Sequence, residues 1–207
     1  MTSWDYLFRR KDNAVGEVAG IESSKIEIYV YPEHFDKIRI GSIFLINSDD
    51  VKPIGLVLRL AHTSRYGSFT PMRMTRSEIQ RAYPDLEKYH MFVSTIIYTS
   101  HLGRDQKIRH FRASAPRLHD LVYLVNDKEL LDAFFRPEMW DFNFLRYFFD
   151  EGAGVLEFRD FLYTHKEYFQ SREAEKEEIL EAMINSLLTS SVDLRLILQE
   201  IGEILGW

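Results

Sequence analysis

The chain contains no cysteine among its 207 residues. This absence excludes disulfide bonds, thiolate nucleophiles and cysteine-ligated zinc or iron–sulfur centres. The sequence also lacks any run of about 18 apolar residues, and its first residues show no cationic segment followed by an apolar stretch. We therefore predict neither a membrane span nor a secretory leader, and we expect a cytoplasmic protein that makes no contact with a membrane.

Catalytic motifs are missing as well. None of the ten glycines begins the pattern Gly-x-x-x-x-Gly-Lys-Ser/Thr, the loop whose backbone amides hold the phosphates of a nucleoside triphosphate. The clustered pair Gly152 and Gly154 lacks both the third glycine and the lysine. The seven histidines form no His-Glu-x-x-His motif. The sequence therefore predicts a protein that is not an enzyme, with no catalytic residue, no metal site and no bound cofactor.

Charge is distributed unevenly along the chain, although the net charge is only −6. Residues 1–51 contain 6 Lys or Arg and 9 Asp or Glu, residues 52–119 contain 12 and 4, and residues 120–207 contain 8 and 19. A basic middle followed by an acidic end has two explanations. Either the basic segment binds a polyanion, or the segments neutralise each other across an internal interface.

The residues between 14 and 125 predict a small β-barrel. Short segments rich in β-branched and aromatic residues, some alternating polar with apolar, are separated by turn residues at intervals of about 8 to 12 positions. Residues 61–90 are polar and basic, and we interpret them as an insertion that becomes helical from Thr75 onward. The predicted strands cover residues 15–21, 25–30, 40–46, 53–60, 91–100, 107–112 and 121–125.

From residue 126 the apolar pattern changes to the period of amphipathic helices. Asn126 or Asp127 is the expected cap of the first helix, and Pro137 is the expected start of the second. The last two helices should form an antiparallel hairpin, with residues 189–191 as turn and N-cap. The aromatic residues of the stretch 140–149 are expected to be core. The predicted helices run over residues 126–135, 137–149, 158–169, 173–188 and 192–205. The predicted fold class is α+β, with a barrel over 14–125 and a helical domain over 126–207.

Five segments of the first two thirds of the chain combine strand patterns with glycines. They are residues 16–24 (GEVAGIESS), 40–46 (IGSIFLI), 53–57 (PIGLV), 115–125 (APRLHDLVYLV) and 127–131 (DKELL). Their order and spacing resemble the HAS-barrel, the N-terminal barrel of HerA-type DNA-translocating ATPases, over about residues 14–135. Glycines inside the strands of a tight barrel mark bulges or close backbone approaches, which is the expected role of Gly16, Gly20, Gly41 and Gly55. In that family a motor domain follows the barrel. Because the phosphate-binding loop is missing here, the resemblance implies only the assembly function.

The first hypothesis for function is therefore a non-enzymatic assembly or adaptor protein. It would act with a DNA-translocating or DNA-end-processing machine through protein contacts. The resemblance implies a HerA-type ATPase, or further copies of the chain, as the partner. An apolar helix that ends in tryptophan is either folded back or offered to a partner. The candidate partner-binding residues are Leu198, Ile201, Leu205 and Trp207.

A second hypothesis is a stand-alone nucleic-acid-binding protein that uses the basic surface of residues 59–117. Non-specific binding needs a cluster of cations, and a single-stranded target also needs exposed aromatic rings for base stacking. The candidate rings are Tyr66, Phe69 and Tyr83. The candidate cations are Arg65, Arg73, Arg76, Arg81, Arg104, Lys107, Arg109, Arg112 and Arg117, with His110 among them.

The least favoured hypothesis is a metal-dependent nuclease. Asp150, Glu151, Glu157 and Asp160 lie close together in the sequence, and clustered carboxylates bind the metal ions of such enzymes. Acidic residues are also common in the first turns of helices, because they interact favourably with the helix dipole. We prefer this structural interpretation of the four carboxylates.

Overall fold

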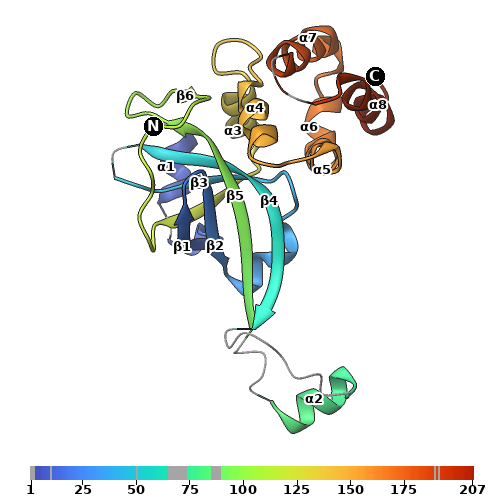
Figure 1. Cartoon of the computed structure of the whole chain (residues 1–207). Coiled ribbons are helices and arrows are strands. Elements are labelled where there is room, and N and C mark those ends of the chain that lie inside the picture. The colour runs from blue at the N-terminus through green and yellow to red at the C-terminus, as the bar shows by residue number, and fades with distance from the viewer. Residues whose placement is uncertain are drawn as a thin grey trace.

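The chain forms a closed antiparallel β-barrel with helices at one end and a projecting ribbon at the other (Figure 1). The structure is a computed structural model, and it describes residues 3–9, 11–49, 51–64, 74–84, 90–188, 190 and 192–207. The fold class is α+β, as predicted. The strands are β1 (Gly16–Glu22), β2 (Lys25–Val30), β3 (Ile43–Ile46), β4 (Lys52–Ser64), β5 (His90–Leu102), β6 (Ile108–Arg109) and β7 (Leu121–Val125).

Six strands close the barrel in the order β1-β2-β5-β4-β3-β7, and every neighbouring pair is antiparallel. Closure depends on the pairing of β2 with β5, which runs from Lys25 opposite Ile97 to Val30 opposite Phe92. β6 pairs only with the end of β5 and lies outside the ring. A closed sheet removes most of the free strand edges that an open sheet exposes. The predicted barrel architecture is therefore confirmed.

Two apolar cores lie on opposite faces of β3. Phe44 and Ile46 belong to the cluster that fills the barrel, whereas Ile43 and Leu45 belong to the cluster shared with the helices. Side chains alternate between the two faces of a strand, so a strand that is buried on both faces reads as a continuous apolar run. This explains the sequence IFLI, in which all four residues are fully buried.

The C-terminal helices gather at one end of the barrel (Figure 1). α4 packs on β5 and on α7, while α8 packs on α5 and α6. Within the described ranges, no helix combines the length and the apolar character that crossing a membrane requires. The helices are α1 (Ser3–Phe8), α2 (Arg76–Ala82), α3 (Lys128–Phe135), α4 (Asn143–Asp150), α5 (Val155–Thr164), α6 (Lys166–Gln170), α7 (Lys176–Leu187) and α8 (Leu194–Leu205), with short 3-10 turns at Lys11–Asn13, Pro32–Lys37 and Glu173–Glu175.

Aromatic rings form the centre of the helical core. Phe134, Phe135, Phe142, Phe144, Phe148, Phe158, Phe161 and Phe169 are all fully buried. Most neighbouring rings meet tilted or edge to face, as in the pair Phe134 and Phe144, whose centroids are 4.8 Å apart, whereas Phe135–Phe142 and Phe158–Phe161 are stacked. Such arrangements suit the quadrupole of aromatic rings and add to the free energy of burial. The burial of Trp140, Phe142, Phe144, Phe148 and Phe149 confirms the prediction that the aromatic stretch is core.

The barrel and the helical layer meet closely at Gly41. This residue has a φ of +81°, and a Cβ atom at this position would lie 2.4 Å from the Cα atom of Phe161 in α5. Two hydrogen bonds cross the same junction. Thr164 Oγ1 donates to the Ile40 carbonyl at 2.8 Å, and His165 Nε2 donates to the Gly41 carbonyl at 3.0 Å. Only glycine allows both the backbone conformation and the approach of α5.

Several strands have limits that differ from the predicted ones. β3 begins at Ile43 rather than at residue 40, because residues 39–42 form a turn around Gly41. The predicted strand over 107–112 is reduced to Ile108–Arg109. The reason is that the Arg112 side chain, rather than a backbone N–H, donates to the Tyr98 carbonyl at 2.7 Å.

The helices also differ from the predicted ones. α4 begins at Asn143 and not at Pro137; its N-cap is Phe142, and the Asp141 carboxylate in the preceding turn accepts a hydrogen bond from the Asn143 N–H. The single helix predicted over 158–169 is two helices, α5 and α6, with a break at His165.

The turn predicted between the last two helices lies mostly outside the described residues, since residues 189 and 191 are not among them. The N-cap of α8 is Asp193, whose carboxylate accepts from the Arg195 N–H, whereas the N-cap was predicted within residues 189–191. α7 packs mainly on α4, and α8 packs mainly on α5 and α6. The two last helices therefore contact earlier helices more than they contact each other.

Candidate interaction surface

The β4–β5 ribbon projects away from the barrel and carries α2 at its far end (Figure 1). Its two strands are 13 residues each and pair from Lys52 opposite Leu102 to Ser64 opposite His90. The predicted insertion over 61–90 is therefore partly strand, since both strands extend into it. α2 lies at the opposite end of the molecule from the C-terminal helices (Figure 1). The ribbon thus holds a helix at a distance from the body of the protein.

Thr75 and Glu78 define the start of α2. The Thr75 hydroxyl accepts from the Glu78 N–H, and the Glu78 carboxylate accepts from the Thr75 N–H at 2.7 Å. This reciprocal capping box lowers the pKa of the Glu78 carboxyl. The helix predicted from Thr75 is confirmed. Met74 and Tyr83, which flank α2, are 38% and 50% exposed.

A cluster of rings lies where the ribbon leaves the barrel. Phe92 on β5 lies directly opposite His62 on β4, and the two rings stack with centroids 4.3 Å apart. Phe35 approaches Phe92 to 4.5 Å, and His90 approaches His62 to 4.8 Å. Cross-strand aromatic pairs stabilise a two-stranded ribbon. The base of the ribbon is therefore held by packing as well as by backbone hydrogen bonds.

The predicted basic surface is divided between the ribbon and the barrel. Arg65 and Arg73 lie outside the described residues, as do Tyr66 and Phe69. Arg76 and Arg81 lie on α2, and Arg104 lies in the turn between β5 and β6. The structure therefore does not bring the basic set together as one cluster within the part of the chain that it describes.

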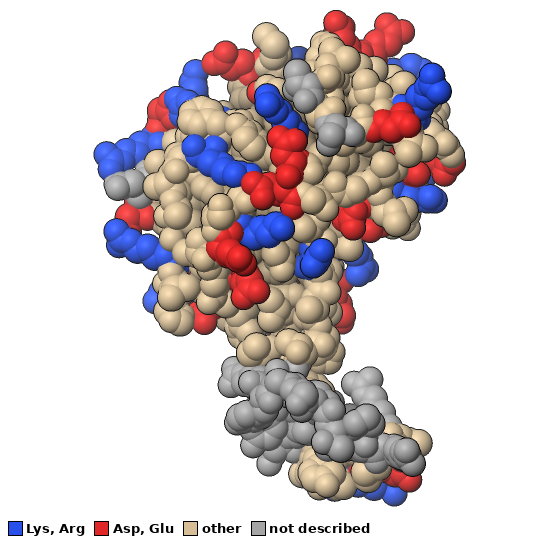
Figure 2. All heavy atoms as spheres, viewed as in Figure 1, with Lys and Arg blue, Asp and Glu red and all other residues tan. Residues whose placement is uncertain are grey.

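The barrel cations form ion pairs with carboxylates. Lys107 Nζ lies 3.0 Å from Glu138 Oε1, Arg112 lies 2.7 Å from Glu151, and Arg117 lies 2.9 Å from Asp49. Arg109 on β6 pairs with Asp105 of the preceding turn and lowers the pKa of that carboxyl to about 2. Glu138 and Glu151 belong to the acidic last third of the chain. For these pairs, the basic and acidic segments neutralise each other, and Figure 2 shows the two kinds of charge interspersed over the body.

His110 was expected on the basic surface, and this expectation is wrong. Its ring is 8% exposed, with Nδ1 2.8 Å from Ser100 Oγ and Nε2 3.1 Å from the Phe134 carbonyl. Burial lowers the pKa of His110 to about 4. His110 is therefore a neutral core residue that joins β5 to α3.

Two buried histidines should make the stability of the protein depend on pH. Burial lowers the pKa of both His110 and His165 to about 4. The unfolded chain takes up these protons near the ordinary histidine pKa, so protons favour unfolding. Stability is retained above about pH 6.5 and falls as the pH drops toward 4, by about 2 kcal/mol per histidine between pH 7 and pH 5.

The test is urea unfolding at a series of pH values. His165→Gln keeps an amide that can donate to the Gly41 carbonyl but does not titrate, so the pH dependence of its unfolding free energy should be shallower than that of the wild type. His119→Gln, which changes an exposed histidine, is the control. Equal slopes for His165→Gln and the wild type would contradict the assignment.

The predicted partner-binding residues of α8 face in different directions. Ile201 and Leu205 are 1% and 4% exposed and pack in the helical core, so they are not surface residues. Leu198 is 45% exposed. Trp207 is half-buried and meets Phe169 of α6 edge to face, with centroids 6.5 Å apart. The terminal tryptophan is thus folded back on the helical layer.

The four carboxylates considered for a nuclease have separate structural roles or neighbours. Glu151 pairs with Arg112, and Asp150 lies 3.7 Å from Arg146. Glu157 accepts from the Gly154 N–H at 2.8 Å and caps α5. Burial raises the pKa of Asp160. Among the residues that the structure describes, no group of three or more His, Asp or Glu is placed to hold a metal ion.

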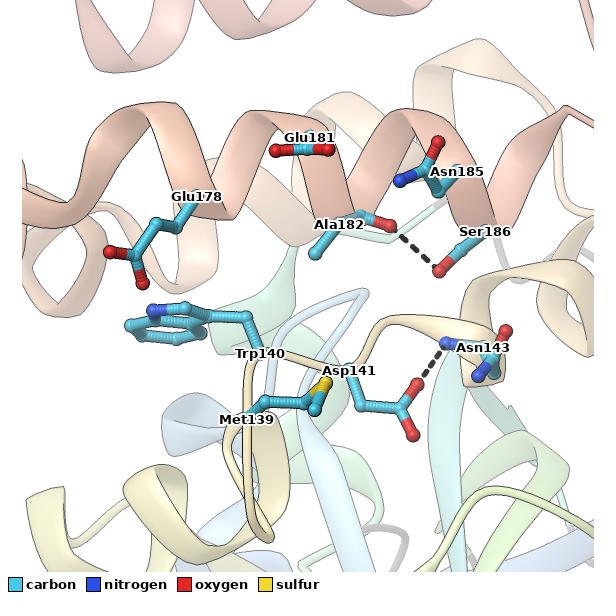
Figure 3. Close-up of a pocket in the computed structure, with 9 residues that line it drawn as sticks. All are labelled: Met139, Trp140, Asp141, Asn143, Glu178, Glu181, Ala182, Asn185 and Ser186. Carbon is cyan, nitrogen blue, oxygen red and sulfur yellow. Dashed lines mark hydrogen bonds between the residues drawn. The ribbon is translucent and has the colours of Figure 1, made fainter.

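A pocket of about 490 Å³ lies between the loop before α4 and helix α7 (Figure 3). Two of its lining residues have partners within the chain: Asp141 accepts from the Asn143 N–H, and Ser186 Oγ donates to the Ala182 carbonyl at 2.8 Å. These bonds stabilise the loop and the helix themselves. The lining residues are Met139, Trp140, Asp141, Asn143, Glu178, Glu181, Ala182, Asn185 and Ser186.

Comparison with known proteins found no family model and no curated protein that matches the sequence. What the structure shows is the architecture, a closed barrel of six antiparallel strands with a helical layer. The relationship to the HAS-barrel therefore depends on the resemblance of the sequence segments and on an architecture compatible with a barrel domain.

Proposed function

We propose that the protein is a non-enzymatic assembly or adaptor protein that binds a protein partner through the β4–β5 ribbon. The observation that carries the proposal is the ribbon itself, which extends beyond a closed barrel and presents α2 with the exposed side chains of Met74 and Tyr83. Its last two residue pairs, Thr63 opposite Met91 and Ser64 opposite His90, lie beyond the pairing of β5 with β2. Exposed apolar residues on a projecting element are typical of protein interaction sites.

The charge distribution favours a protein partner over a nucleic acid. Lys107, Arg109, Arg112 and Arg117 are each engaged by a carboxylate of the same chain. A nucleic-acid surface needs cations whose charge acts on phosphates, and internal pairing weakens that field. The resemblance to the HAS-barrel points to a HerA-type ATPase in a DNA-translocating or DNA-end-processing machine, or to further copies of the chain, as the partner.

A shortened variant tests the segment with α2 that the ribbon carries, and it keeps the strands of the ribbon. Ser64 lies directly opposite His90, so residues 65–89 can be replaced by Asn-Gly, the two-residue turn that suits adjacent antiparallel strands. We expect the wild type to self-associate or to co-elute with a HerA-type ATPase in size-exclusion chromatography with light scattering. The shortened variant should elute as a monomer, without the ATPase, and should still unfold cooperatively.

The matched control changes an exposed apolar residue away from the ribbon. Leu156 on α5 is 69% exposed, and Leu156→Ala should associate as the wild type does. Tyr83→Ala should weaken association while leaving the barrel intact. The proposal fails if the shortened variant associates like the wild type, or if the wild type is a monomer that captures no ATPase. DNA binding that weakens steeply with salt would support the nucleic-acid hypothesis in its place.

A further inference from the structure

A second cavity lies at the junction of the barrel and the helical layer, with a volume of about 620 Å³. On the barrel side it is lined by the segment that leads into β3 and by the end of β7, and on the other side by α3 and by the end of α5 and the start of α6. The hydrogen bonds from Thr164 and His165 to the carbonyls of Ile40 and Gly41 hold its two sides together. We name this cavity the junction cleft.

Three cations from separate segments line the junction cleft. Lys37 ends a 3-10 turn, Arg39 lies in the turn before β3, and Lys128 is the first residue of α3. Within the described ranges, none of the three side chains forms an ion pair, in contrast to the paired cations of the barrel surface. Glu167 is the only carboxylate among the described lining residues. The cleft therefore concentrates positive charge that the protein itself does not balance.

Neutral hydrogen-bonding groups accompany the cations. Ser42 Oγ accepts from the Arg39 N–H at 3.0 Å, which leaves its own hydrogen available to a ligand. The side-chain amide of Asn126 and the hydroxyl of Tyr163, whose residue is 67% exposed, also line the cleft. Burial keeps His165 neutral by lowering its pKa, so this ring adds no charge. Charged groups surrounded by hydroxyl and amide donors suit a ligand with several anionic oxygens.

We infer that the junction cleft binds a small anion that carries two or more phosphate groups, of the size of a nucleoside diphosphate. Three cations against one carboxylate leave an excess of two positive charges, which a diphosphate would neutralise. The volume lies in the range of about 300 to 1,000 Å³ that is typical of small-molecule sites. The phosphates would be held by side chains rather than by a glycine-rich loop. This inference does not depend on the proposed function, because none of its residues lies in the ribbon.

Isothermal titration calorimetry at about 50 mM salt, where screening is moderate, tests the inference. ADP, inorganic pyrophosphate and adenosine are the probes. We expect ADP and pyrophosphate to bind and adenosine, which has no phosphate, not to bind. Arg39→Ala and Lys128→Ala should each weaken binding by about tenfold, because each removes a charge-assisted contact. Arg39→Lys, which keeps the charge but loses the planar fork, should weaken it less.

The control is Lys176→Ala, which removes an exposed cation of α7 that does not line the cleft. This variant should bind as the wild type does, and all variants should keep the wild-type melting temperature because the changed residues are exposed. Tighter binding of ADP than of pyrophosphate would identify a nucleotide ligand, and equal binding would identify the diphosphate alone as the recognised group. The inference is overturned if neither probe binds, or if Arg39→Ala and Lys128→Ala bind both probes as tightly as the wild type.

Discussion

Replacing Gly41 by alanine should destabilise the protein by about 4 kcal/mol, a large fraction of the stability of an ordinary domain. Two costs combine at this position. A side chain at a φ of +81° is strained, by about 1 to 3 kcal/mol. The added Cβ would also lie 2.4 Å from the Cα of Phe161, so α5 would have to move away from the barrel. Urea unfolding followed by tryptophan fluorescence would measure the loss.

Gly152 offers a matched control for this substitution. It also has a positive φ, of +104°, but a Cβ built there meets no atom within 4 Å. Gly152→Ala therefore carries only the conformational cost, about 1 to 3 kcal/mol. The difference between the two variants isolates the close contact between the barrel and α5. If both variants lost the same stability, the tight approach at Gly41 would not contribute.

Phe135→Ala should be the most damaging change in the helical core, with a loss of about 3 to 5 kcal/mol. The ring is fully buried, and it lies 5.2 Å from Phe169, 5.2 Å from Tyr168 and 5.4 Å from His165, measured between centroids. Its removal would leave a cavity that the rigid neighbouring rings cannot close. The measurement is again the free energy of unfolding in urea.

Phe111→Ala makes the same chemical change at a surface position. Phe111 is 49% exposed, and its ring meets that of His101 edge to face, with centroids 4.7 Å apart. Its loss should cost about 1 kcal/mol or less, because little buried area disappears. A cost at Phe111 as large as that at Phe135 would mean that the aromatic cluster is not the main support of the helical layer.

Local patterns in the sequence predicted the features that depend on near neighbours. The alternation of residues 25–30 predicted β2, and Thr75 with Glu78 supplied the cap that starts α2. Closure of the barrel requires β2 to pair with β5, about 70 residues further along the chain, and no local pattern encodes that pairing. A closed barrel was predicted only from the number and spacing of the strands and from the resemblance to a barrel family, and neither identified β2 and β5 as partners.

Other features were hidden because they depend on long-range contacts. Residues 40–46 have the pattern of one continuous strand, but the chain turns at Gly41. We attribute this turn to the close approach of Phe161 in α5, 120 residues later. His110 fits an alternating basic strand in the sequence, yet its position against Phe134 makes it a core residue. Lys37, Arg39 and Lys128 showed no relationship in the sequence. They line one cavity because β7 pairs with β3. This pairing places the start of α3, which follows β7, beside the turn that precedes β3.

β3 is buried on both faces, and this limits where the chain can be cut into fragments that fold. A boundary at residue 125 separates the barrel strands from the C-terminal helices, but Ile43 and Leu45 belong to the apolar cluster shared with those helices. In a fragment that stops at Val125, that apolar face of β3 would be exposed to solvent, and the fragment would be prone to aggregation. The barrel therefore cannot be transferred to another protein by itself. A fusion protein that contained it would need other apolar residues to bury the same face of β3.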